Sequence, residues 1–339
     1  MILTIAIPTY NRPEKVRKTL LSLIPQLKEN VFITVLDNCS DVDLRTYLQQ
    51  DIPPSFANSI EVIRHKVNIG ADANFQRCVE LCTTPYIWIL GDDDRVESNA
   101  VSSILEELNN FKHLDLIGIN FNSNCCQVER KSPVTISSTA ELAEKLDFFG
   151  NWLFISTSVY KTEEYLKHVR FQMWGAYSMA SQLVAPMVAI SKNKTLVLSE
   201  KYIVSNVPVA DRNAKWSDFQ ISLSLTTLLE ANVGFKDDDY YKFGKKLKYQ
   251  FVLIGEIVYS ILKSVNFNID LIDDYHIYIY KQIYNRTIEF RDNRFKQSII
   301  FYSWLFFLRN KVLLKVFWKL VPHIRKRAKD SLFFYLFKR

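Results

Sequence analysis

Three consecutive carboxylates, Asp92, Asp93 and Asp94, follow Gly91 at the end of the apolar run 86–90. The run is apolar at successive positions, which is typical of a short strand buried on both faces. Like charges this close repel, and a divalent cation removes that cost. Mg²⁺ and Mn²⁺ prefer oxygen ligands and are commonly held by one or two carboxylates together with substrate phosphates. The segment therefore indicates a metal–phosphate site, with a solvated acidic turn as the alternative.

The elements that must position these carboxylates alternate along the first third of the chain. Apolar runs of strand length alternate with segments of helical periodicity, which indicates an α/β fold with a mostly parallel sheet flanked by helices. The expected strands are 3–7, 31–36, 60–63, 86–90 and 114–120, and the expected helices are 13–27, 41–50, 72–82 and 98–109. Such sheets bind ligands at the carboxyl ends of their strands.

Polar segments follow three of these strands, namely 9–12, 37–38 and 92–94. We expect these three segments to lie together at one edge of the sheet. Together they favour a ligand site more strongly than any one of them does alone. The chain has neither G-x-G-x-x-G after the first strand nor G-x-x-x-x-G-K-[ST], the two common glycine-rich phosphate loops. We therefore expect a bound nucleotide to be held mainly through a metal.

The rest of the chain is organised differently. Residues 134–210 predict a mixture of helices (139–146, 177–190) and strands (152–160, 195–199, 202–207). After Pro208, long helical patterns follow at 217–230, 240–263 and 269–284. We place a domain boundary near residue 212, between an N-terminal domain (1–212, with halves 1–120 and 121–212) and a helical C-terminal region (213–339).

Composition sets broad limits on the class of protein. The 339 residues are 48% hydrophobic and 23% charged, which are globular values. The five cysteines have no zinc-site spacing, and we expect reduced thiols. The N-terminus reads as a first strand rather than a signal peptide, and no apolar run reaches the length of a membrane-spanning helix. These features predict a cytoplasmic protein.

The positive charge is concentrated at the C-terminus. Residues 301–339 contain ten Lys or Arg and one acidic residue, a net +9, whereas the whole chain carries +7, which leaves −2 for residues 1–300. Aromatic and basic residues interleave from residue 298 onward, a combination suited to an anionic membrane surface. We predict that the tail 298–339 contacts the cytoplasmic face of the inner membrane. The alternatives are packing on the main domain and nucleic-acid binding, and the acidic main domain disfavours the latter.

Four motifs, taken in order, resemble the family 2 glycosyltransferases of the GT-A fold. They are residues 5–12 (IAIPTYNR), 35–38 (VLDN), 68–70 (NIG) followed by Asn74, and 91–94 (GDDD). The resemblance covers residues 3 to about 120. Beyond it, residues 154–160 are similar to a strand that lies under the acceptor site in bacterial enzymes that build O-antigen or capsular polysaccharide.

The resemblance implies roles for the nucleotide-binding half. Pro8, Thr9 and Tyr10 would line the nucleotide pocket, with Tyr10 beside the base. Asp37 would hydrogen-bond the base, which favours uracil and hence a UDP-sugar. Arg12 would add positive charge near the diphosphate, or would be a solvated side chain of the first helical turn.

The resemblance also implies roles around the donor sugar and the metal. Asn68 and Asn74 would lie near the nucleotide or the donor sugar. Asp92 would face the ribose or the sugar and join the metal site, Asp94 would bind the Mn²⁺ or Mg²⁺ that bridges the diphosphate, and Asp93 would share either role.

Transfer with inversion needs a base that deprotonates the acceptor hydroxyl. Many members of the family carry this base in a Glu-Asp pair on a helix after the acceptor strand, but the corresponding segment here, 174–182, has no carboxylate. Asp211 is our candidate, and a domain-boundary turn is the alternative for that position.

The sequence thus predicts a metal-dependent glycosyltransferase that acts on a saccharide or lipid-linked saccharide acceptor in bacterial surface polysaccharide biosynthesis. A nucleotidyltransferase has a similar sheet and acidic site, but it needs a glycine-rich basic first loop, and residues 8–12 contain no glycine. A catalytically degenerate scaffold of a polysaccharide assembly complex is the non-enzymatic alternative.

Overall fold

The structure is a computed structural model, and it describes residues 2–123, 129–174, 180–205, 228, 234–251, 258, 261–262, 268–290 and 293–317. Asp211 lies outside these residues, as do the second half of the predicted tail and most of the expected helix 217–230. The chain divides into two compact units. Unit 1 comprises Met1–Asn213 and Val233–Asp239, and unit 2 comprises Ala214–Asn232 and Tyr240–Arg339.

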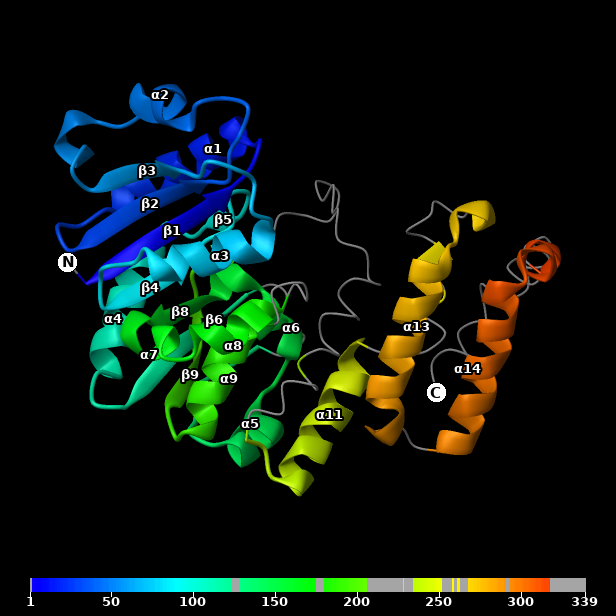
Figure 1. Cartoon of the computed structure of the whole chain (residues 1–339). Helices are drawn as coiled ribbons and strands as arrows, with labels where there is room; N and C mark the ends of the chain where they lie inside the picture. Colours follow the sequence, from blue (N-terminus) through cyan, green and yellow to red (C-terminus); the bar gives the residue numbers. More distant parts are fainter. Residues whose placement is uncertain are drawn as a thin grey trace. The chain divides into compact units, whose positions relative to one another are not determined.

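Unit 1 is built on a large, mostly parallel sheet (Figure 1). Its strand order is β3-β2-β1-β4-β8-β6-β9-β7. The strand bounds are β1 Leu3–Thr9, β2 Val31–Asp37, β3 Ile60–Arg64, β4 Tyr86–Ile89, β6 Leu116–Asn122, β7 Val134–Ile136, β8 Ser158–Lys161 and β9 Thr195–Tyr202. A small antiparallel ribbon pairs β5 (Arg95–Val96) with β10 (Val204–Ser205).

Strand β1 is the turning point of the sheet. It pairs in parallel with β2 on one side and with β4 on the other, while β3 extends the sheet beyond β2. The chain thus runs outward from β1 through β2 and β3 and then returns to the opposite side of β1. This reversal of strand order is the place at which open α/β sheets bind ligands.

The sheet is flanked by helices, as Figure 1 shows. The bounds in unit 1 are α1 Pro13–Leu23, η1 Ile24–Gln26, α2 Leu44–Gln49, η2 Pro54–Phe56, α3 Ala71–Glu80, α4 Ala100–Asn110, α5 Thr139–Lys145, α6 Phe149–Leu153, η3 Ile155–Thr157, α7 Thr162–Leu166, α8 Val169–Trp174, η4 Ser181–Leu183 and α9 Val184–Ser191. Every residue of β1 is buried, and the core includes the fully buried Trp88. The expected α/β class and helix–strand alternation are confirmed.

One expected element is wrong. The segment 152–160 was expected to be a strand, but α6 continues to Leu153, η3 follows, and only Ser158–Lys161 is extended. Hydroxyl groups compete with the strand ladder here, because Thr157 Oγ1 donates to the carbonyl groups of Asn151 (2.6 Å) and Phe154 (2.7 Å). The strand that does form is antiparallel to both of its neighbours, β4 and β6.

Unit 2 is helical where the structure describes it. Its elements include α13 Asp274–Thr287, α14 Arg294–Arg309, η6 Ile269–Leu271 and η7 Ile288–Phe290, and α11 spans Asp237–Phe251. Helix α13 begins with a capping box in which the Asp273 side chain accepts from the backbone N–H of His276. Tyr280 and Ile283 of α13 share a buried cluster with Phe301 and Leu305 of α14. Among the described helices, none is long and apolar enough to cross a membrane.

Candidate active site

The carboxyl ends of β1 and β4 bring the first loop and the acidic segment together. Thr9 Oγ1 donates to Asp92 Oδ2 at 2.6 Å, and Arg12 pairs with Asp92 Oδ1 at 2.9 Å. Thr19, on α1, donates to the Asp92 carbonyl oxygen at 2.9 Å. Asp92 is only 4% exposed, and this burial raises its pKa, while the hydrogen bond from Thr9 and the charge of Arg12 act in the opposite direction.

Asp93 is the exposed member of the acidic segment. Its carboxylate pairs with Lys15 at 2.7 Å and with Arg12 at 3.3 Å. Arg12 and Lys15 therefore balance the charge of Asp92 and Asp93, and they place two cations beside the acidic segment. Both of these basic side chains are partly exposed, so they are accessible to an anionic ligand.

Asp94 is held by a residue from the opposite half of the unit. Ser156 Oγ donates to Asp94 Oδ2 at 2.5 Å and accepts from the Gly91 backbone N–H at 2.8 Å. The Ser156 carbonyl accepts from Trp88 Nε1 at 2.8 Å. A Cβ at Gly91 would lie 2.5 Å from Asp94 Oδ2 and would displace this carboxylate from its present position. Ser156 and Gly91 together define the orientation of Asp94.

The end of β2 carries Asp37, which is fully buried. Its carboxylate accepts from the Ser40 backbone N–H at 2.8 Å and from Arg64 Nη1 at 3.3 Å. Asp37 thereby shapes the turn after β2, and a direct contact with a base would require this turn or Arg64 to move. Tyr10, predicted beside the base, is 43% exposed and accessible to a stacking ligand.

The loop that leads into α3 is organised by asparagines. Asn38 Nδ2 donates to Asn68 Oδ1 at 2.9 Å, and Asn38 Oδ1 accepts from the Ile69 backbone N–H at 2.9 Å. Asn74 is 3% exposed, and its amide contacts His65 Nε2 at 2.9 Å and the Leu36 carbonyl at 3.3 Å. Asn74 is therefore a buried residue that links α3 to His65 and to β2, whereas Asn68 is on the surface.

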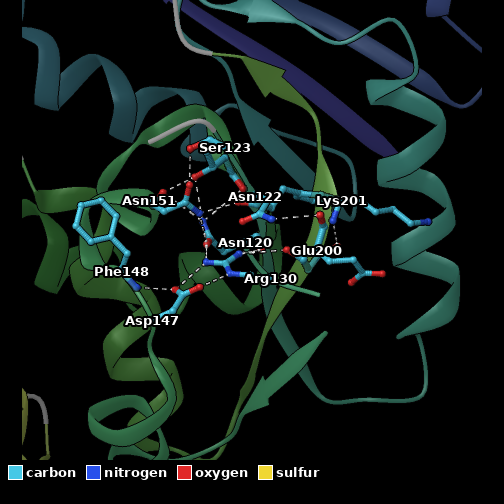
Figure 2. A network of polar contacts seen from close by, with 12 residues as sticks. Asn120, Asn122, Ser123, Arg130, Asp147, Phe148, Asn151, Glu200 and Lys201 are labelled. Carbon is cyan, nitrogen blue, oxygen red and sulfur yellow. Dashed lines mark hydrogen bonds and ion pairs between the residues drawn. The ribbon is translucent and has the colours of Figure 1, made fainter. Parts of the chain in front are cut away.

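A buried polar network, centred on the residues labelled in Figure 2, contacts the two residues that follow Ser156 in the chain. Arg130 pairs with Asp147 at 2.6 Å and donates to Asn120 Oδ1 at 2.8 Å. Asn120 Nδ2 in turn donates to Thr157 Oγ1 at 2.9 Å and Ser158 Oγ at 3.0 Å. Figure 2 shows Arg130 between Asp147 and Asn120, with Asn151 beside them. The network thereby holds Thr157 and Ser158, which directly follow Ser156 in the chain.

The fit of the site to a divalent metal rests on its donor set. Asp94 lies at the strand end, where its Oδ2 accepts from Ser156, and both oxygens of Asp92 accept hydrogen bonds from Thr9 and Arg12. No group of three His, Cys, Asp or Glu side chains suited to a metal occurs among the residues that the structure describes. A hard cation at this edge would be held by carboxylate oxygens of Asp92 or Asp94 and completed by substrate oxygens.

The acceptor side is described in part. The predicted base, Asp211, lies outside the described residues. At the start of η4, Ser181 Oγ donates to Asp72 Oδ1 at 2.8 Å, which brings a carboxylate of α3 to the segment that lacks one of its own.

The sequence did not single out Ser156, Lys15 or Arg64. Ser156 belongs to a Ser-Thr-Ser run inside an otherwise apolar segment, and this run of hydroxyls is the signal that could have pointed to it. Lys15 and Arg64 read as ordinary surface residues.

Comparison with known proteins gives the family. The model of glycosyl transferase family 2 matches residues 4–166. A curated relative, abequosyltransferase RfbV of Salmonella typhimurium (strain LT2), is 28% identical over 137 residues, which is 39% of this chain and 40% of that protein. The match of the family model, over just under half of the chain, confirms the resemblance to the family 2 glycosyltransferases seen in the sequence. The alignment spans less than half of the curated relative.

Solved structures of low sequence identity share the fold. S. aureus TarS (residues 1–349) in complex with UDP has a TM-score of 0.58 at 14% identity, covering 92% of this chain and 88% of that one. The mannosyltransferase PcManGT from Pyrobaculum calidifontis, in complex with GDP-Man and Mn²⁺, has a TM-score of 0.50 at 11% identity, covering 93% and 86%. These likenesses support the GT-A architecture of the chain.

Proposed function

We propose that this chain transfers a sugar from a nucleotide-sugar donor, with a UDP-sugar favoured, to a saccharide or lipid-linked saccharide in bacterial surface polysaccharide biosynthesis. The observation that carries the proposal is the meeting of three strand ends at one edge of the sheet. These ends bring together the first loop with Arg12, the turn at Asp37, and the acidic segment with Asp94. The curated relative is named as an abequosyltransferase, and TarS is described with UDP; both agree with this class of reaction.

The donor half of the mechanism follows from the residues that line this edge. Asp94, oriented by Ser156, would hold Mn²⁺ or Mg²⁺. When bound, such a cation neutralises the charge that develops on a nucleoside diphosphate leaving group. Arg12 and Lys15 would exchange part of their pairing with Asp92 and Asp93 for the diphosphate, because both side chains already lie beside the acidic segment. Tyr10 would stack on the base.

The acceptor half requires removal of a proton from the attacking hydroxyl. We propose Asp211 as the base of an inverting reaction. Asp211→Asn keeps the shape of the side chain and removes its basicity, so it should lower transfer while donor binding is retained. An undiminished transfer rate would exclude Asp211 from this role.

We also propose that the tail 298–339 keeps the enzyme at the cytoplasmic face of the inner membrane, beside a lipid-linked acceptor. The basic and aromatic composition of the tail supports this placement.

A donor screen tests the proposed activity. Purified protein is incubated with a saccharide acceptor and a UDP-, CDP-, GDP- or dTDP-sugar, with and without Mn²⁺, and release of the nucleoside diphosphate is measured. The proposal expects release from a UDP-sugar that depends on Mn²⁺ and falls with Asp94→Asn. Release of pyrophosphate from a nucleoside triphosphate and a sugar phosphate would instead identify a nucleotidyltransferase.

A further inference from the structure

Helix α14 of unit 2 is apolar on two separate sides. On one side, Phe301, Leu305 and Leu308 are buried and pack in the cluster shared with α13, where Phe301 stacks on Tyr284 with ring centroids 3.7 Å apart. The other side carries four exposed apolar residues, here named the α14 stripe: Phe295 (79% exposed), Ile299 (52%), Tyr302 (61%) and Phe306 (58%). Packing in the core of unit 2 accounts for the apolar residues on the first side of α14 but not for those on the second side.

The α14 stripe is a single face of the helix. Its members are four, three and four residues apart, and at 3.6 residues per turn they fall within an arc of about 60°. The segment after α14 also exposes apolar side chains, because Val312 and Val316 are 71% and 52% exposed. A helix that is apolar beyond its packed side indicates a second apolar environment.

The helix segment that carries the stripe is basic. Residues 294–317 contain five cations and no acidic residue, and all five are exposed: Arg294, Lys296, Arg309, Lys311 and Lys315. Lys315 pairs with Asp270 of the preceding η6 at 2.7 Å. A depression of about 370 Å³ lies on this face, lined by Tyr302, Leu305, Phe306, Arg309 and Asn310. Arg309 thus places a cation at the edge of an apolar hollow, an arrangement that suits a lipid phosphate above buried acyl carbons.

We propose that the α14 stripe is the surface through which this chain lies on an anionic lipid bilayer. Phe, Tyr and Ile enter the boundary between headgroups and acyl chains, while Lys and Arg remain at the level of the lipid phosphates. A second copy of the chain is the less favourable occupant, because pairing two stripes face to face brings Arg294, Lys296 and Arg309 of each copy together. The inference rests on the proposed membrane-side acceptor and names the residues that make the contact.

Vesicle co-sedimentation of the full chain tests this surface. The vesicles are phosphatidylcholine alone, or phosphatidylcholine mixed with phosphatidylglycerol. The test variant is Ile299→Ser with Phe306→Ser, and its matched control is Leu21→Ser with Met173→Ser, which removes exposed apolar side chains (41% and 56%) from unit 1. A charge variant, Lys296→Gln with Arg309→Gln, separates the electrostatic contribution from the apolar one.

The wild type and the control should sediment with anionic vesicles, and less so with neutral vesicles or at high salt. The α14-stripe variant should lose roughly tenfold or more in partition coefficient, because two apolar side chains no longer enter the bilayer. The charge variant should lose roughly tenfold or more in partition to phosphatidylglycerol vesicles, because two of the five cations of the segment are removed. The thermal midpoint of the stripe variant should stay at the wild-type value, since both side chains are exposed.

Two results would overturn the inference. One is equal sedimentation of the stripe variant and its control. The other result combines two observations. The wild type shows no affinity for anionic vesicles, and light scattering finds a wild-type dimer that the stripe substitutions convert to a monomer. That result would assign the face to a second copy of the chain. Release of nucleoside diphosphate with a water-soluble acceptor should be the same in all variants, so failure of the membrane surface and failure of the proposed transferase activity give different readouts.

Discussion

Replacing Ser156 by alanine should weaken metal binding through Asp94 without removing a metal ligand. The hydroxyl of Ser156 is completely buried, accepts from the Gly91 N–H at 2.8 Å and donates to Asp94 Oδ2 at 2.5 Å. The variant leaves the Gly91 amide without this acceptor, which costs about 1–3 kcal/mol in free energy of unfolding. It also removes the hydroxyl that donates to Asp94 Oδ2. Loss of a partner that orients a metal ligand lowers metal affinity about 10–100-fold, or about 1.4–2.8 kcal/mol.

Calorimetric titration of Mn²⁺ in the presence of UDP measures this effect. Ser158→Ala is the matched control, because Ser158 is also buried and its hydroxyl accepts from Asn120 Nδ2 at 3.0 Å. Both variants should lose stability, but only Ser156→Ala should lose Mn²⁺ affinity. Unchanged affinity in Ser156→Ala, or an equal loss in both variants, would refute the role of Ser156 as the residue that positions Asp94.

Three further changes test the scaffold of the site. Arg130→Ala removes the guanidinium that pairs with Asp147 at 2.6 Å. The free energy of unfolding, measured by urea titration, should fall by about 3–5 kcal/mol. A loss below about 1 kcal/mol would contradict the pairing. Gly118→Ala should lower the thermal midpoint, at a cost of about 1–3 kcal/mol, because a Cβ there would lie 2.5 Å from the Val159 carbonyl oxygen; an unchanged midpoint would show that β6 and β8 are not so close. Burial raises the pKa of Tyr160 to about 12 from 10.0. Its contribution to stability is therefore complete below about pH 10 and is lost as the pH rises toward about 12, by up to about 2.7 kcal/mol. Tyr160→Phe should flatten this part of the pH profile of unfolding, and an unaltered profile would assign it to other groups.

Much of the fold was predictable because local signals and tertiary structure agree. The apolar runs of β1, β2 and β4 are buried on both faces, so they read as strands in the sequence and are strands in the sheet. The end of the first helix was less predictable. Helix α1 stops at Leu23, and the turn that contains Pro25 continues as η1 to Gln26.

The segment 152–160 was misassigned for a physical reason. Its aromatic and β-branched residues favour a strand, but side-chain hydroxyls satisfy the backbone locally at Thr157 and across the fold through Asn120. Which hydrogen bonds a hydroxyl makes is decided by partners far away in the sequence. A prediction from the local sequence pattern therefore cannot include these hydrogen bonds.

The same limit applies to the site. The motifs located the acidic segment and the first loop, but the pairing of Asp94 with Ser156 joins residues 62 positions apart. The burial of Asp37 against Arg64 and the balance of Asp93 by Lys15 are likewise tertiary facts. The sequence thus predicted which strand ends meet at this edge of the sheet, while the neighbours that orient its carboxylates emerge from the structure.

The most direct test of the central proposal is the thermal midpoint of wild type and Asp94→Ala with UDP, in the presence and absence of Mn²⁺. A ligand that binds the native state raises the midpoint, so the wild type should show a rise with UDP that increases when Mn²⁺ is added. Asp94→Ala should lose the Mn²⁺-dependent part, whereas Asp115→Ala, which removes a carboxylate that is 59% exposed, should keep it. A Mn²⁺-dependent rise that persists in Asp94→Ala would contradict the assignment of this strand end as the metal–nucleotide site.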